Sequence, residues 1–104
     1  MGLFYIHPNT LPPIIYIPNA FVPEGVNTIF KPVLSDFDPA DYDFTIFDRW
    51  GQAIFRTNMP SEGWDGTIAF SGEMATTGTY LYMLTLKDGD GIEIIKRGYV
   101  TLLK

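Results

Sequence analysis

The sequence predicts an all-β domain, an antiparallel β-sandwich of about seven strands. Three observations lead to this fold class. Two stretches alternate apolar and polar side chains, as strands with one buried face do. Each stretch ends at a turn containing aspartate and glycine and is followed by a second extended stretch, which is the pattern of a β-hairpin. The other segments are short runs punctuated by proline and glycine, and none shows the periodicity of a helix.

The N-terminal third of the sequence predicts short, peripheral strands. Residues 3–6 and 14–17 are apolar runs separated by prolines, which confine strands to sheet edges or entry positions. Residues 17–23 contain two prolines and are expected to be extended, because the residue before a proline avoids the helical region. Residues 29–34 contain a further proline and predict another edge strand.

The middle of the chain predicts a clear hairpin. Residues 42–47 alternate, with Phe44 and Ile46 on the same face. Residues 52–56 form the expected partner strand. Between them, Gly51 can adopt the positive φ that a bulged hairpin turn needs.

A second hairpin and a closing strand are predicted at the C-terminal end. Residues 79–86 give the best alternation in the chain, and residues 88–91 turn it back into residues 92–95. We expect a break at residues 96–98 and a last strand over residues 99–103. Glycines are expected to serve turns at five positions: Gly25, Gly51, Gly66, Gly78 and Gly98. Five side chains are expected in the core: Phe44, Ile46, Trp64, Tyr82 and Leu84.

Length and charge limit the classes of function. The chain has 104 residues, which is enough for one domain, divided here into an entry segment (residues 1–16, a linker or a first strand) and a main domain (residues 17–104). A net charge of −5 argues against nucleic-acid binding. Without cysteine there is no disulfide framework, and no apolar run approaches the length of a membrane span. No signal peptide is visible, and Met1-Gly2 resembles a start added to a fragment of a longer protein.

Four aspartates close in sequence raise the question of a calcium site, since hard cations bind clustered oxygens. They are Asp36, Asp38, Asp41 and Asp43. An EF-hand loop beginning at Asp36 is excluded, because Ala40 and Asp41 occupy the places of a ligand and of the required glycine. We interpret the stretch as a solvated acidic turn, with Asp38-Pro39 initiating it. No metal is expected here.

The second acidic turn and the single histidine also favour simple interpretations. Asp88 and Asp90 offer too few ligands for a cation, and Asp-Gly pairs are the usual choice for such turns. His7, the one histidine, lies beside Pro8 and is expected at the surface rather than in a catalytic triad. No sequence motif of an enzyme or of a cofactor site is present. We therefore predict a non-enzyme without cofactors.

Two tryptophans could serve either a core or a sugar-binding platform. Small sandwiches need bulky core residues, and a buried indole N–H usually finds a backbone acceptor. We place Trp64 in the core on this ground, and favour the core more weakly for Trp50, which lies at a hairpin tip. Exposed, planar aromatics would instead indicate an adhesion or carbohydrate-binding module, which is the alternative function.

Six motifs in register resemble a known family. They are Ile17-Pro18-Asn19-Ala20-Phe21, Phe30-Lys31-Pro32, Thr45-Ile46-Phe47-Asp48-Arg49-Trp50-Gly51, Trp64-Asp65-Gly66, Gly78-Thr79-Tyr80-Leu81-Tyr82 and Lys96-Arg97-Gly98-Tyr99-Val100-Thr101-Leu102. Together they resemble the gliding motility-associated C-terminal domain of Bacteroidetes, the type B sorting domain of the type IX secretion system. One departure is the loop around Gly25, which is shorter than in relatives and lacks their two aspartates.

The resemblance implies an immunoglobulin-like sandwich at the end of a larger exported protein. Such domains are read by outer-membrane translocon components, which would be the partners here, with cargo domains upstream in the same polypeptide. The whole protein would pass through the periplasm and then reach the cell surface or the medium. The resemblance does not identify the cargo.

The C-terminal strand carries the expected contact residues. Three of the seven basic side chains fall within the last nine residues: Lys96, Arg97 and Lys104. On an acidic domain this cluster can steer docking. If residues 99–104 lie at a sheet edge, their backbone groups can pair with a receptor strand, and we include Tyr99 among the contacts. The alternative is that these cations only protect a hydrophobic strand from aggregation.

Overall fold

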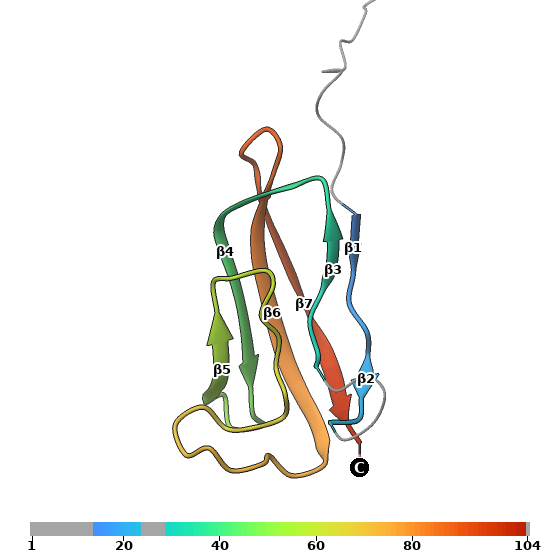
Figure 1. Ribbon diagram of the computed structural model, residues 1–104, viewed down its shortest axis with the longest axis vertical. Coiled ribbons are helices and arrows are strands. Elements are labelled where there is room, and N and C mark those ends of the chain that lie inside the picture. The colour runs from blue at the N-terminus through green and yellow to red at the C-terminus, as the bar shows by residue number, and fades with distance from the viewer. Residues whose placement is uncertain (1–13, 24–28, 104) are drawn as a thin grey trace, which may run out of the picture.

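The computed structural model describes residues 14–23 and 29–103 and shows seven β-strands there (Figure 1). A sheet of two strands, β1 and β3, lies against a five-stranded sheet in the order β2-β7-β6-β4-β5. The bounds are β1 (Ile14–Tyr16), β2 (Ala20–Phe21), β3 (Val33–Ser35), β4 (Phe37–Phe47), β5 (Ala53–Thr57), β6 (Gly78–Asp88) and β7 (Glu93–Leu102). The predicted immunoglobulin-like β-sandwich is confirmed. All pairs are antiparallel except β2–β7, which is parallel.

Some predictions fall outside the described residues. They concern the strand at residues 3–6, His7, Gly25 and Lys104. Within the described ranges, no helix is long and apolar enough to cross a membrane.

The first predicted hairpin is present, and its first strand is longer than expected. Gly51 turns β4 into β5 with φ 81°, and the pairing shifts between Ile46 and Phe47, as a bulged hairpin requires. However, β4 begins at Phe37, so Asp38, Asp41 and Asp43 lie within a strand that starts earlier than predicted, while Asp36 precedes it. The turn predicted at Asp38-Pro39 is present inside this strand, because the Ala40 N–H donates to the Asp38 carboxylate and Asp41 adopts φ 63°. The strand tolerates this stretch through an irregularity in its pairing with β6 between Asp38 and Asp43.

The predicted break at residues 96–98 is wrong, because β7 runs without interruption. Gly98 pairs with Tyr82 of β6, and a Cβ atom at position 98 would lie 2.5 Å from the Tyr82 hydroxyl. Gly98 is therefore needed for close approach of an aromatic ring, not for a turn. Gly78 is likewise the first residue of β6 rather than a turn residue.

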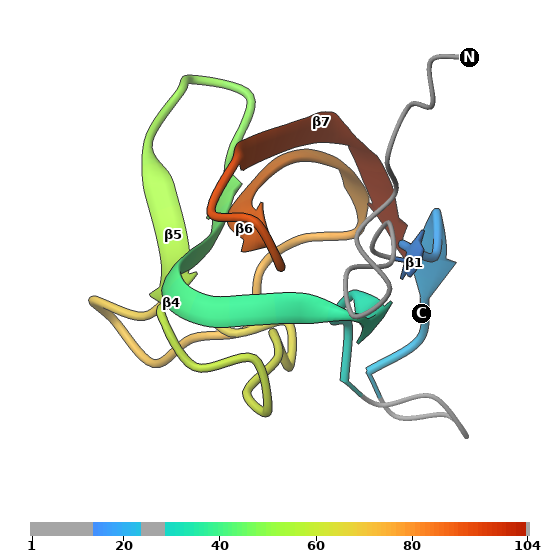
Figure 2. The ribbon, with the colours of Figure 1, turned by 90° about the horizontal axis from the view of Figure 1, so that it is seen from above.

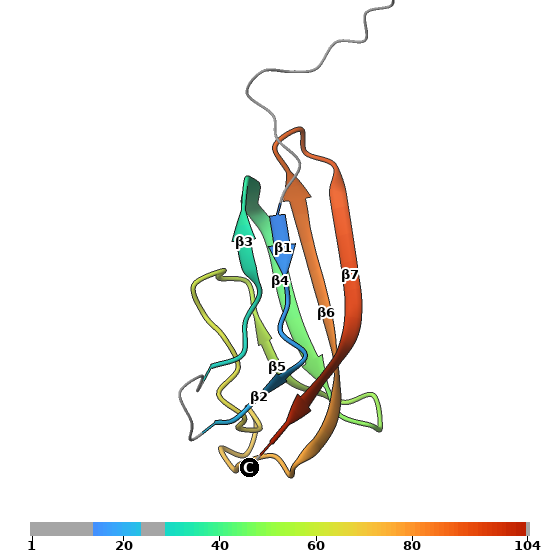
Figure 3. The same ribbon diagram turned by 90° about the vertical axis from the view of Figure 1, so that its right-hand side faces the viewer.

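Trp64 lies at the centre of the core, as predicted. Its side chain is fully buried and its indole N–H donates to the Thr67 carbonyl at 2.8 Å. The rings of Phe21 and Tyr80 flank it at centroid distances of 5.3 and 5.2 Å. Two backbone hydrogen bonds join Trp64 to Phe30 across the sandwich. The long segment between β5 and β6 thus closes the side that the short two-stranded sheet leaves open (Figure 3).

The other core predictions are confirmed with one adjustment and one correction. Phe44, Ile46 and Leu84 are fully buried, while Tyr82 is half-buried and packs against the core. Trp50 is 82% exposed, so its placement in the core is wrong. The β4–β5 turn that carries it stands out from the body of the two sheets (Figure 2).

Candidate functional site

The alternation of β7 separates the residues that the sequence analysis grouped together. Val100 and Leu102 point into the core and are buried, so Lys96 belongs to that face and Arg97 and Tyr99 to the opposite, outer face. Lys96 is nevertheless exposed. Arg97 and Tyr99 are brought together on the outer face of the five-stranded sheet, whereas Lys96 belongs to the other face.

On the outer face, Arg97 and Tyr99 lie beside a row of apolar side chains that the sequence analysis missed. Tyr99 is paired with Leu81 of β6, and Leu81 with Phe47 of β4. One step along β6, Met83 lies between Arg97 and Thr45. Tyr99 is 68% exposed, and Phe47, Leu81 and Met83 are half-buried. The signal in the sequence is that Leu81 and Met83 occupy the face of their strand on which strict alternation would place polar residues.

Residues 101–103 do not lie at a sheet edge, so the edge expected over residues 99–104 is wrong for this part of it. β2 lies beside the C-terminal part of β7 (Figure 3). The Thr101 N–H donates to the Asn19 carbonyl and the Leu103 N–H to the Phe21 carbonyl, both at 2.9 Å. The terminal residues therefore complete the sheet.

An open edge does exist nearer the start of β7. The Thr101 N–H points toward β2, so the backbone groups of residues with the same parity point to that same side. These residues are Glu93, Ile95, Arg97 and Tyr99. No strand of the described ranges pairs with them there. This free edge includes Arg97 and Tyr99, whose side chains lie on the outer face.

The acidic stretch forms ion pairs and local hydrogen bonds. The Asp43 carboxylate lies 2.6 Å from the Arg56 guanidinium, whose pKa it raises, and Asp41 lies 2.9 Å from the Lys87 ammonium. Asp38 accepts a hydrogen bond from the Ala40 N–H. In the part of the chain that the structure describes, no group of three or more acidic or histidine side chains is arranged to hold a metal ion.

Tyr42 gives a test of the fold at alkaline pH. Its hydroxyl is buried without a hydrogen-bond partner among the described residues, and burial, helped by the charge of Asp43, raises its pKa from 10.0 to about 12. Between these values the unfolded chain loses a proton that the folded chain keeps, so stability falls as pH rises. We expect Tyr42→Phe to remove this part of the pH dependence. At neutral pH the variant should be equally stable or more stable by about 1 kcal/mol, since the unpaired hydroxyl is gone.

Urea unfolding of both proteins at neutral pH and at about pH 11 measures the effect. Lysine titration is common to both proteins and cancels in the comparison. Equal losses of stability on going to alkaline pH would contradict the role given to Tyr42.

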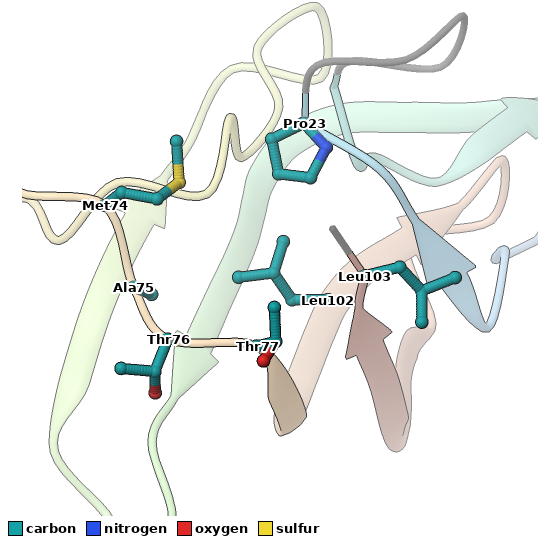
Figure 4. A pocket seen from close by; sticks show the side chains of 7 residues that line it. All are labelled: Pro23, Met74, Ala75, Thr76, Thr77, Leu102 and Leu103. Carbon is teal, nitrogen blue, oxygen red and sulfur yellow. The ribbon is translucent and has the colours of Figure 1, made fainter.

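Two cavities lie at the end of the sandwich where β7 ends. The first, of about 420 Å³, is lined by apolar and threonine side chains: Pro23, Met74, Ala75, Thr76, Thr77, Leu102 and Leu103 (Figure 4). The second, of about 590 Å³, continues along the segment entering β6 and reaches the β4–β5 turn with Asp48, Arg49 and Trp50. Both are open, and Met74 to Thr77 form the wall between them.

The fold defines a small immunoglobulin-like β-sandwich module with an open edge and an apolar outer row. The chain belongs to the type IX secretion signal domains, because the family model described as CHU_C Type IX secretion signal domain matches residues 15–102. The resemblance stated from the sequence motifs is thereby confirmed. The family gives the domain a role in secretion sorting, and this role implies interaction with the type IX machinery and export toward the cell surface or the extracellular space.

Comparison with solved structures supports the fold alone. The crystal structure of CopC from Methylosinus trichosporium OB3b is similar, with a TM-score of 0.55 and 13% sequence identity over 84% of each chain. No curated protein matches this chain.

Proposed function

We propose that this chain is a non-catalytic C-terminal sorting domain that directs a larger exported protein through the type IX secretion system and attaches it to the surface. The observation that carries the proposal is the family match over residues 15–102. The domain proper is residues 17–104, preceded by the entry segment 1–16, whose last three residues form β1. The cargo lies upstream and passes through the periplasm, and components of the outer-membrane translocon bind the domain.

We further propose that these translocon components bind to β7. The free edge at Glu93–Tyr99 offers N–H and C=O groups to a receptor strand, as in recognition by strand addition. Arg97 and Tyr99 flank the added strand on the outer face and Lys96 on the other face. Lys96 and Arg97 are adjacent on this edge, so pairing between two copies of the domain would bring like charges together and is discouraged. A receptor strand with acidic side chains avoids this repulsion and is therefore favoured. Lys104, which lies outside the described residues, stays a contact predicted from the sequence.

Charge reversal on β7 tests this function. We expect Lys96→Glu, Arg97→Glu and Lys104→Glu together to block export of a fluorescent reporter fused between a signal peptide and the whole chain in a Bacteroidetes host. The physical reason is that the variant repels an acidic strand at the edge it must join. Surface and medium fluorescence measure export, and thermal unfolding of the purified domain checks the fold.

A matched control carries two reversals of the same sign away from β7, Lys31→Glu and Arg56→Glu, and is compared with Lys96→Glu and Arg97→Glu together. Lys87 is left unchanged because it pairs with Glu93 at the open edge of β7. The ion pair of Arg56 with Asp43 that the control loses is largely exposed, and such pairs contribute little, about 0–1 kcal/mol. Export of the β7 variant at the control's level would refute the β7 contact. Failure of the unaltered chain to export the reporter would refute the sorting function itself.

The alternative function, an adhesion or carbohydrate-binding module, is favoured by the exposure of Trp50. The second tryptophan does not support it, because Trp64 is buried and cannot contribute to a platform. Glycan binding by the purified domain that disappears in Trp50→Ala would support this alternative.

A further inference from the structure

We propose that the tip of the β4–β5 turn, Arg49 and Trp50, is a second anchor for the export receptor. Trp50 enters an apolar pocket of that protein and Arg49 pairs with a carboxylate at its rim. The inference rests on the proposed sorting function and names a contact that is separate from β7.

The turn presents these two side chains on a fixed backbone. The Asp48 carboxylate accepts hydrogen bonds from the N–H groups of Trp50 and Gln52, both at 2.9 Å. The Asp48 carbonyl accepts one from the Gly51 N–H at 3.0 Å, and the Asp48 N–H donates to the Gln52 carbonyl at 2.9 Å. Gly51 adopts φ 81°. Because the backbone is held in this way, little conformational entropy is lost there on binding.

A second turn in the same molecule shows that this backbone needs neither arginine nor tryptophan. The β6–β7 turn repeats the arrangement, with the Asp88 carboxylate accepting from Asp90 N–H at 2.8 Å and from Ile92 N–H at 2.9 Å. The Gly91 N–H donates to the Asp88 carbonyl at 3.0 Å, and Gly91 has φ 82°. Its tip residues are Gly89 and Asp90. The Arg49-Trp50 pair is therefore not required to make the turn.

Nothing in the described fold requires a tryptophan at this exposed tip. The ring is 82% exposed and the Arg49 guanidinium lies 5.9 Å from its centroid. An indole in water is unfavourable, and tryptophan and arginine are the residues most enriched among the dominant contacts of protein interfaces. The Arg49 cation held over the ring adds charge complementarity to an acidic rim of the partner's pocket.

The position of the turn suits a receptor contact. β1 begins at one end of the sandwich, whereas the β4–β5 turn and the end of β7 lie at the other (Figure 1). The cargo joins ahead of β1, so the Trp50 end faces away from it. The cavity of about 590 Å³ beside Trp50 can receive a partner segment. A protein is favoured over a sugar, because Trp64, the other tryptophan, is buried and cannot extend the Trp50 ring into a platform.

The two turns supply a matched exchange of sequence. In the first variant, Arg49→Gly and Trp50→Asp install the tip of the β6–β7 turn. In the second, Gly89→Arg and Asp90→Trp are added, so that the displaced pair stands at the opposite end of the molecule with composition unchanged. Each is fused as the whole chain to the reporter described above, and the purified domains are compared by urea unfolding.

We expect the unaltered chain to export the reporter and the first variant to export about tenfold less or lower still, as loss of a dominant interface contact does. The second variant should not regain export. Trp50→Ala alone should show the same loss, which covers the case in which the exchanged turn folds poorly. Normal export by either the first variant or Trp50→Ala would overturn the inference, as would recovery in the second variant.

A failure of the unaltered chain would instead refute the sorting function. The remaining alternative is a glycan site at Trp50. It is tested by acrylamide quenching of Trp50 fluorescence in the presence of purified surface polysaccharide. Protection of the ring by the polysaccharide would overturn the protein contact in favour of a glycan site, and unchanged quenching would support the protein contact.

Discussion

Replacing Trp64 with alanine is expected to destabilise the domain by about 3–5 kcal/mol, the range for removing a buried tryptophan from a core. The indole is fully buried between the rings of Phe21 and Tyr80. Its N–H donates to the Thr67 carbonyl, which the substitution leaves without that partner. Small domains are stable by about 5–15 kcal/mol, so a large share of the total is lost. Urea unfolding followed by circular dichroism measures the difference.

Trp50→Ala is the matched control for this experiment. The same residue type is removed, but the ring is exposed, so a change within about 0.5 kcal/mol is expected. Because these are the two tryptophans of the chain, the control also isolates the emission of the buried indole. Similar losses in both variants would show that Trp64 does not hold the two layers together.

Gly63→Ala is expected to have the next largest effect, about 1–3 kcal/mol or more, as for atoms inserted into a packed region. A Cβ atom at position 63 would lie 2.8 Å from the Phe30 carbonyl oxygen and 2.9 Å from Lys31 Cβ, and against the side chain of Ile29. That carbonyl oxygen already accepts the Trp64 N–H at 2.8 Å. An added methyl group therefore forces apart the bridge that joins the segment before β6 to the segment before β3.

The same substitution at Gly72 separates this effect from backbone strain. A Cβ atom there meets nothing within 4 Å, but φ is 75°, which favours glycine. Gly72→Ala should cost about 1 kcal/mol through the backbone alone. A smaller loss for Gly63→Ala than for Gly72→Ala, in the same denaturation assay, would contradict the steric argument.

Local patterns in the sequence predict the two hairpins well. Residues 42–47 and 79–86 alternate because one face of each strand packs on the core, and this requirement acts residue by residue. The glycines at the tips predict the turns for the same reason, as Gly51 and Gly91 adopt positive φ. Trp64 is predictable because few places in a small sandwich other than its centre can hold a bulky aromatic.

Features that depend on distant neighbours could not be predicted in this way. Gly98 is read as a break because nothing in its own segment shows that the Tyr82 ring lies against it. The turn at Asp38-Pro39 is predicted from its residues, but only the pairing with β6 shows that it lies inside the longer strand β4. Trp50 is placed in the core by residue type, although only the geometry of the tip decides its exposure.

The candidate contacts show the same division. The basic residues near the C-terminus are visible in the sequence, but which face each one occupies follows from the direction in which Val100 and Leu102 point. The location of the open edge follows from where β2 begins, and β2 is only two residues long. No local pattern fixes the pairing of so short a strand with the other end of the chain.

The parallel pairing of β2 with β7 has a mechanical consequence. β2 lies near the start of the domain and β7 at its end, so a pull on the two ends of the domain slides these parallel neighbouring strands past each other lengthwise. The bonds from Thr101 to Asn19 and from Leu103 to Phe21 lie crosswise to that tension. These two bonds share the load and must break together, not one after the other. The pairing of β2 with β7 therefore makes the domain resistant to shear between its two ends.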